Sequence, residues 1–138
     1  MERKSFPAAL EFLSEIRAYV QSAAEGAGLE DKKTYTLQLA VDEIATNIIV
    51  YGYKEAGLQG DVTIEAVSTD ESLTVTLLDT GSPFDPRTRE MPDEEDLSKP
   101  LEERPVGGLG IYFAFTGVDK FDYRREGETN VNTFVVNR

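Results

Sequence analysis

Hydrophobic residues near the start of the chain recur with helical spacing. Apolar side chains stand three or four positions apart from Leu10 to Val20, as on one face of a helix. Pro7, two residues after Ser5, suits the first turn of such a helix. Glycines at positions 26 and 28 are typical of its end.

A second and longer helical pattern follows. It is predicted to run from Asp31 to about Tyr53 and to end near Gly57. The residues expected on its main apolar stripe are Leu37, Val41, Ile44, Ile48 and Tyr51.

The pattern then changes from helical spacing to strict alternation. Apolar and polar residues alternate over 62–66 and again over 73–77, which predicts a hairpin. A second hairpin is predicted where 121–123 and 131–135 alternate in the same way. Strands gathered in hairpins indicate an α+β fold, with helices packed on one face of a largely antiparallel sheet.

Between the two hairpins the hydrophobic pattern is interrupted. Residues 85–106 are polar, rich in acidic side chains and proline, and long enough for a functional lid. The alternative is a solvated, partly disordered insertion, and composition alone favours this alternative. The short apolar run over 111–116 is predicted to be helical.

Composition narrows the classes of function. The 138 residues carry 14 basic and 26 acidic side chains, and the net charge of −12 argues against nucleic acid or an anionic membrane as partner. Cysteine and histidine are absent, which excludes disulfides, thiolate chemistry, Ser-His-Asp triads and a phospho-accepting histidine within this sequence. No apolar run approaches the roughly 20 residues of a membrane span, so we expect one cytoplasmic domain.

Two polar residues of the second helix stand among apolar ones. Glu43 and Asn47 are four positions apart, so their side chains are neighbours on the helix surface. A carboxylate here suits a general base, and an amide oxygen suits a ligand of Mg²⁺, which prefers oxygen. The alternative is a half-exposed polar pair at the edge of a buried helix.

Asp79 continues the alternation of the first hairpin onto the apolar face. A buried carboxylate requires hydrogen-bond donors, and Gly81 allows a backbone to approach a ligand closely. The alternative is an aspartate that caps a turn after the strand.

A glycine cluster precedes the predicted helix at 111–116. Backbone amides of Gly107, Gly108 and Gly110 suit phosphate at the positive end of that helix. Arg104 suits bidentate phosphate binding, although a solvated charge is the simpler interpretation of this residue. The cluster lacks the lysine of a Walker loop.

Together these segments resemble the GHKL ATPase superfamily. Residues 43–47 resemble its asparagine-containing box, 79–81 its adenine-binding Asp-x-Gly box, and 107–110 its second glycine box, in the same order and spacing. Within the superfamily, 39–47 and 100–111 resemble bacterial anti-sigma factor serine-protein kinases. The segment 112–118 departs from the Leu- and Met-rich helix usual there, which bears on the lid and the partner surface.

The resemblance implies a Bergerat fold, in which helices cover one face of a mixed, mostly antiparallel sheet and ATP binds between the layers. Residues 1–138 would form a single ATP-binding kinase domain with a lid at 85–106.

The resemblance also implies roles for individual residues. Glu43 would be the general base, and Asn47 would contact ATP through bound Mg²⁺. Asp79 would accept from the adenine amino group, with Gly81 and Thr133 close by. The terminal phosphates would be held by Arg104 and by the backbone of Gly108, Leu109 and Gly110.

The function implied is that of an ATP-dependent protein serine kinase and anti-sigma factor. Such a kinase uses ATP and Mg²⁺ to phosphorylate a serine of an anti-sigma factor antagonist, and it sequesters a sigma factor; members often form homodimers. One alternative is a nucleotide-gated protein-binding module with little or no kinase activity, acting on another partner. A second is an acidic interaction domain without nucleotide.

Overall fold

The computed structural model describes residues 1–85 and 116–138. The helical elements are the short η1 (Leu10–Phe12), α1 (Leu13–Ala27), α2 (Asp31–Asn47) and η2 (Ile48–Lys54). The strands are β1 (Lys4–Pro7), β2 (Asp61–Ser68), β3 (Ser72–Asp79), β4 (Lys120–Glu126) and β5 (Thr129–Asn137).

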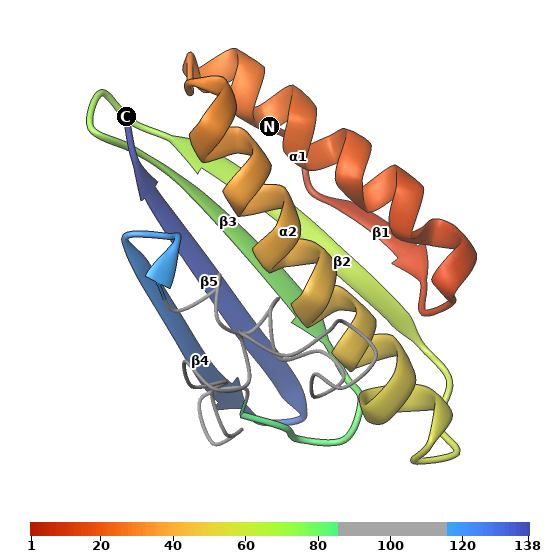
Figure 1. Cartoon of the computed structure of the whole chain (residues 1–138). Coiled ribbons are helices and arrows are strands. Elements are labelled where there is room, and N and C mark those ends of the chain that lie inside the picture. Colours follow the sequence, from red (N-terminus) through yellow and green to blue (C-terminus); the bar gives the residue numbers. More distant parts are fainter. Residues whose placement is uncertain (86–115) are drawn as a thin grey trace, which may run out of the picture.

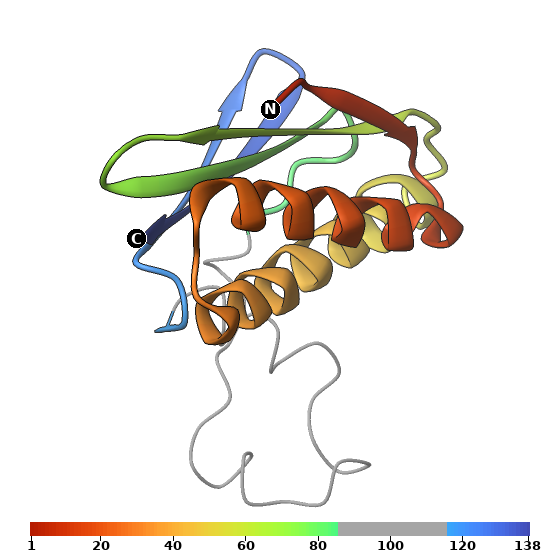
Figure 2. The same ribbon diagram turned by 90° about the horizontal axis from the view of Figure 1, so that it is seen from above.

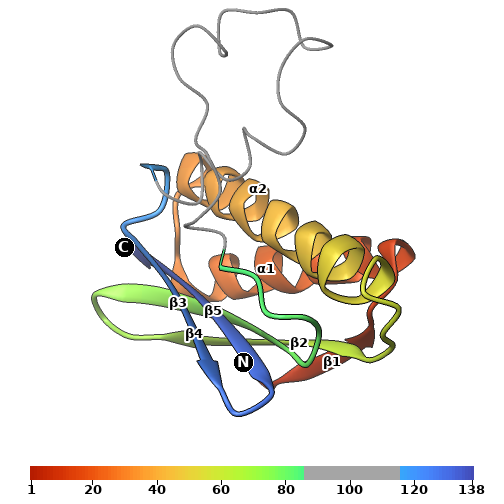
Figure 3. The same ribbon diagram turned by 90° about the horizontal axis from the view of Figure 1, so that it is seen from below.

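The strands form one sheet in the order β1-β2-β3-β5-β4, and all four neighbouring pairs are antiparallel. Helices α1 and α2 lie side by side on one face of this sheet (Figures 1 and 2). The view from below shows the same two layers, with the opposite face of the sheet free of helices among the described residues (Figure 3). The α+β fold with helices on one face is thereby confirmed.

The core lies between the two layers. Alternate residues of β2 and β3 point toward the helices, and Val62, Ile64, Leu73, Val75 and Leu77 are almost completely buried. Leu37, Val41 and Ile44 of α2 meet them from the other layer, as their spacing predicts. Neither helix in the described part of the chain combines the length and apolar character needed to cross a bilayer.

The start of the chain differs from its prediction. Lys4–Pro7 is a strand rather than the approach to a helix, and it pairs with residues 61–64 of β2. Helix α1 begins only at Leu13, after the η1 turn, in which Leu10 is exposed. Pro7 ends an edge strand, where its missing N–H costs the sheet nothing. Pairing with a strand almost 60 residues away leaves no signal in local periodicity.

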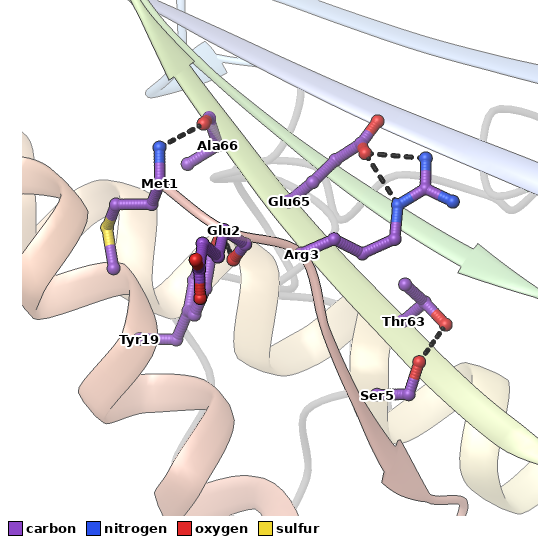
Figure 4. A network of polar contacts seen from close by, with 8 residues as sticks. All are labelled: Met1, Glu2, Arg3, Ser5, Tyr19, Thr63, Glu65 and Ala66. Carbon is purple, nitrogen blue, oxygen red and sulfur yellow. Dashed lines mark hydrogen bonds and ion pairs between the residues drawn. The ribbon is translucent and has the colours of Figure 1, made fainter.

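Polar side chains fasten β1 to its neighbours (Figure 4). Arg3 donates twice to the Glu65 carboxylate, at 2.7 and 2.9 Å, and the Ser5 and Thr63 hydroxyls are 2.7 Å apart. From α1, the Tyr19 hydroxyl donates to the Glu2 carbonyl at 2.8 Å. The strand is therefore held to both the sheet and the helix layer.

The second helix changes its winding at Ile48. Helix α2 continues directly into η2, a π-helical segment with more residues per turn than an α-helix. This shifts the buried face, so Tyr51 is exposed whereas Ile49 and Tyr53 are buried. The prediction of a buried Tyr51 is wrong for this reason, although the predicted helical stretch of 31–53 is confirmed.

The polar stretch after residue 85 and the predicted helix over 111–116 fall almost wholly in 86–115, outside the described residues. The two predicted hairpins are both present, as β2–β3 and β4–β5.

Candidate functional site

A cavity lies where the end of α2 and the first residues of η2 meet the end of β3 and the start of β5. Its interior space is about 10 Å³, and about 270 Å³ when the gaps between its wall atoms and the open solvent at its mouth are counted. Its lining residues are Ile44, Asn47, Ile48, Gly52, Asp79, Ser82, Phe84, Asn130 and Asn132. Buried polar side chains thus share the cavity with an apolar wall from α2.

Asp79 is the charged residue among the described residues that line this cavity. The alternation of β3 places it on the inward face, as predicted, and it is only 4% exposed. Its Oδ1 accepts from the Gly81 N–H and from Asn130 Nδ2, both at 2.9 Å. Its Oδ2 is buried, with no hydrogen-bond donor among the described residues. The carboxylate is therefore held by one oxygen, and the other has no protein partner there.

Burial has an electrostatic consequence for Asp79. Desolvation raises the pKa of its carboxyl group, against the lowering effects of the hydrogen bonds from Asn130 and Gly81 and of the nearby Arg125 charge. A ligand that donates a hydrogen bond to Oδ2 favours the ionised form.

Asn130 orients Asp79 and is itself fixed. Its side-chain oxygen accepts from the Tyr123 hydroxyl at 2.6 Å and from Arg125 Nη1 at 3.0 Å, so its Nδ2 faces Asp79. The same Nδ2 donates to the Gly81 carbonyl at 3.1 Å. Sequence reasoning missed this residue. The available signal was its inward position on β5, in phase with Phe134.

The turn after Asp79 packs directly on η2. A side chain at Gly81 would place its Cβ 2.6 Å from the Gly52 carbonyl oxygen, which also accepts from the Ser82 N–H at 2.7 Å. The Tyr53 hydroxyl accepts from the Thr80 N–H at 2.8 Å. Glycine at position 81 is thus required by close contact between backbones rather than by its dihedral angles.

Asn47 and Glu43 reach this region from α2. Asn47 is 4% exposed and lines the cavity. Glu43 lies one turn earlier, half-buried, with its Oε1 atom shielded from solvent, and is not among the lining residues. The described residues hold no group of three metal-ligating acidic side chains, so a cation here would depend on Asn47, phosphate oxygens and water.

Thr133 is not part of this cavity, and its predicted place beside Asp79 is wrong. It pairs with Thr76 and lies on the sheet face away from the helices, where it lines a shallow hollow with Lys120, Asp122 and Arg124. Because side chains alternate along β5, the inward neighbours of Thr133 are Asn132 and Phe134.

The predicted phosphate-binding residues lie outside the described part of the chain. These residues are Arg104, Gly108, Leu109 and Gly110. Their roles stay predictions.

The comparisons with known proteins agree with this geometry. The sequence pattern of the histidine kinase-like ATPase domain matches residues 6–136. The chain belongs to the histidine kinase-like ATPase domain family. Family membership implies ATP binding.

Relatives in this family include the serine-protein kinase RsbW of Bacillus cereus (strain AH187) and that of Bacillus anthracis. Each is 30% identical to this chain over 134 residues, which is 96% of this chain and 82% of the relative. The similarity to serine-protein kinases therefore includes β1, the cavity and both hairpins.

Similar solved structures support the fold alone. The Acinetobacter baumannii histidine kinase AdeS superposes with a TM-score of 0.53 at 12% identity, over 99% of this chain and 68% of that chain. The histidine kinase domain of the blue-light activated kinase of Erythrobacter litoralis EL346 also has a TM-score of 0.53, at 14% identity, over 95% of this chain and 61% of that one.

Proposed function

We propose that this chain is an ATP-dependent protein serine kinase that phosphorylates an anti-sigma factor antagonist and sequesters a sigma factor. The observation that carries the proposal is the buried Asp79 carboxylate in a cavity that Asn47 also lines. Its Oδ1 accepts a hydrogen bond from Asn130, and its Oδ2 has no hydrogen-bond donor among the described residues. The nearly full-length similarity to serine-protein kinases supports the type of reaction.

The residues that line the cavity suit the adenine of ATP by their chemistry. An exocyclic amino group can donate to Asp79 Oδ2, which satisfies the buried oxygen. Ile44, Ile48 and Phe84 offer apolar surface for the flat faces of the base. The Tyr51 ring lies 6.5 Å from the Phe84 ring and extends this apolar surface.

The phosphates are proposed to extend from the cavity toward Asn47. Mg²⁺ fits an amide oxygen at this position because it keeps water and phosphate as its other ligands, and it would neutralise the charge of the phosphates. The whole chain would act as one ATP-binding domain, with Arg104 and the backbone of 108–110 on the terminal phosphates and a lid at 85–106.

Glu43 is proposed to be the general base. Its carboxylate would take the proton of the substrate serine as the hydroxyl oxygen bonds to the γ-phosphorus. The bond from that phosphorus to the bridging oxygen breaks, and ADP leaves. Asp79 and Asn47 contribute by positioning ATP, and in phosphoryl transfer positioning and charge neutralisation account for most of the rate enhancement.

The acidic surface suits the proposed partners. A net charge of −12 attracts the basic, nucleic-acid-facing parts of a sigma factor, so association should slow as salt rises. Cytoplasmic location and homodimer formation are further parts of the proposal.

Nucleotide binding is tested by thermal unfolding with and without Mg-ATP. Ligand at about 100 times its Kd stabilises a protein by about 2.7 kcal/mol, which raises the midpoint of a domain this size by roughly 10 °C. We expect this rise in the wild type and its loss in Asp79→Asn, whereas the exposed Asp70→Asn should behave as the wild type. No rise in the wild type would leave an acidic interaction domain without nucleotide.

Phosphoryl transfer is tested with γ-³²P-ATP and a purified anti-sigma factor antagonist from the same organism. Glu43→Gln should lose transfer by roughly 10²- to 10⁴-fold and keep its thermal response to Mg-ATP. The exposed Glu55→Gln is the matched control and should transfer normally. Equal transfer by wild type and Glu43→Gln contradicts the proposed base. ATP binding without transfer to any partner supports the binding-module alternative instead.

A further inference from the structure

Asn132 is a further buried polar residue of the cavity, and none of the contacts described above involves its side chain. It is 2% exposed, and its Oδ1 atom is shielded from solvent with no hydrogen-bond donor among the described residues. Leaving such an acceptor unsatisfied lowers the stability of the folded protein. An apolar residue in its place would avoid this cost, so the asparagine offers the folded chain no stability.

The neighbouring Asn130 shows what a structural asparagine looks like in the same strand. Its oxygen accepts from Tyr123 and Arg125, and its Nδ2 donates to Asp79 and to the Gly81 carbonyl. Asn132 lies two residues further along β5 on the same inward face, opposite Leu77, and lines the same cavity. Hydrogen bonds within the protein therefore account for a buried amide side chain at position 130 but not at position 132.

Two buried side-chain oxygens of the cavity have no hydrogen-bond donor among the described residues. Asp79 Oδ2 and Asn132 Oδ1 are both buried acceptors. A ligand that satisfies both must present two hydrogens, as an exocyclic amino group does. A 6-oxopurine has a carbonyl oxygen in place of the amino group. This oxygen is itself an acceptor, so it could not hydrogen-bond to Asp79 Oδ2 or Asn132 Oδ1.

We propose that Asn132 is a specificity-determining residue for the base. Its Oδ1 accepts one hydrogen of the 6-amino group of adenine, and Asp79 accepts the other. The inference rests on the proposed nucleotide site and extends it, because selection of adenine over a 6-oxopurine is assigned to Asn132 as well as to Asp79.

The test compares the binding of ADP and IDP by calorimetry. IDP differs from ADP in having a carbonyl oxygen in place of the amino group. In Asn132→Leu, which is similar in size but apolar, ADP affinity should fall about tenfold while IDP affinity changes little, so the preference for ADP falls about tenfold. Asn137→Leu, an exposed asparagine of the same strand, is the matched control and should keep the wild-type preference.

A stability measurement separates this role from a structural one. Asn132→Leu should unfold at the same urea concentration as the wild type or a higher one, because an unsatisfied buried acceptor is removed. If it fails to fold, Asn132→Ala is measured with the same two nucleotides. A wild-type ADP-to-IDP ratio in the folded variant overturns the proposal for Asn132 and leaves the nucleotide site intact. Absence of ADP binding by the wild type overturns both.

Discussion

Polar side chains cluster at two places in the sheet, the β1–β2 edge and the ends of β3 and β5. At the edge, Arg3 pairs with Glu65 and Ser5 with Thr63, and these contacts are exposed (Figure 4). At the other place, Asp79 and Asn132 are almost fully buried, and one oxygen of each has no donor among the described residues.

The difference separates exposed polar pairs that join β1 to its neighbour from buried acceptors that the proposed ligand would satisfy. Exposed groups can exchange a protein partner for water at little cost, so their pairing adds little stability. A buried acceptor without a partner lowers stability, and it persists where binding requires it. Each of the following predictions tests one side of this contrast.

The largest effect is expected at Gly81. A methyl group there would lie 2.6 Å from the Gly52 carbonyl oxygen, which is held in the backbone. Gly81→Ala should therefore lower the free energy of unfolding by roughly 1–3 kcal/mol and weaken ADP binding, because the turn positions Asp79. Urea unfolding and calorimetry measure the two effects.

Gly26→Ala is the control for this change. Nothing lies within 4 Å of a Cβ at Gly26, which is in α1, so alanine should be neutral or stabilising. If the two variants had equal free energies of unfolding, the close contact between Gly81 and Gly52 would not contribute to stability.

The second effect is a pH dependence that arises from Asp79. Burial raises the pKa of its carboxyl group above the usual 3.8, so the folded protein retains a proton that the unfolded chain releases. This group's contribution to stability is greatest below the unfolded pKa and is lost as pH rises toward the folded pKa, at up to about 1.4 kcal/mol per pH unit. ADP affinity should rise over the same interval, because the ionised carboxylate is the better acceptor.

Urea unfolding of wild type and Asp79→Asn between about pH 4 and 8 isolates this contribution. The difference in stability between the two proteins should change with pH in the direction given. Parallel pH profiles would mean that Asp79 titrates alike in the folded and unfolded chains.

A smaller effect is expected at the β1 edge. Arg3 and Glu65 are 60% and 32% exposed, so their ion pair is screened by water. Arg3→Ala should lower the free energy of unfolding by less than about 1 kcal/mol, and the loss should shrink in high salt. Urea unfolding at low and high salt measures both. If Arg3→Ala lowered the free energy of unfolding as much as Gly81→Ala, the expected difference between the exposed and the buried polar cluster would be contradicted.

No effect on nucleotide binding is expected at Thr133. Its side chain lies on the face of the sheet opposite the cavity. Thr133→Val should bind ADP with the wild-type Kd in calorimetry. A severalfold loss would restore the role that family resemblance suggests for this threonine.

Local patterns were sufficient for much of the fold and part of the site. Alternation predicted both hairpins and the inward position of Asp79, because successive side chains of a strand face opposite sides. Helical spacing predicted α2 and placed Glu43 one turn from Asn47. These features depend only on backbone geometry within a few residues.

Three other features depend on contacts between distant parts of the chain. Residues 4–7 are a strand because they pair with the edge of β2. The turn after Asp79 contacts η2 through the Gly52 carbonyl. Asn130 meets Asp79, 51 positions earlier, because β5 pairs with β3. Periodicity shows which face a residue takes, but strand order and register decide which residue it meets there, and these are set by packing of the whole sheet.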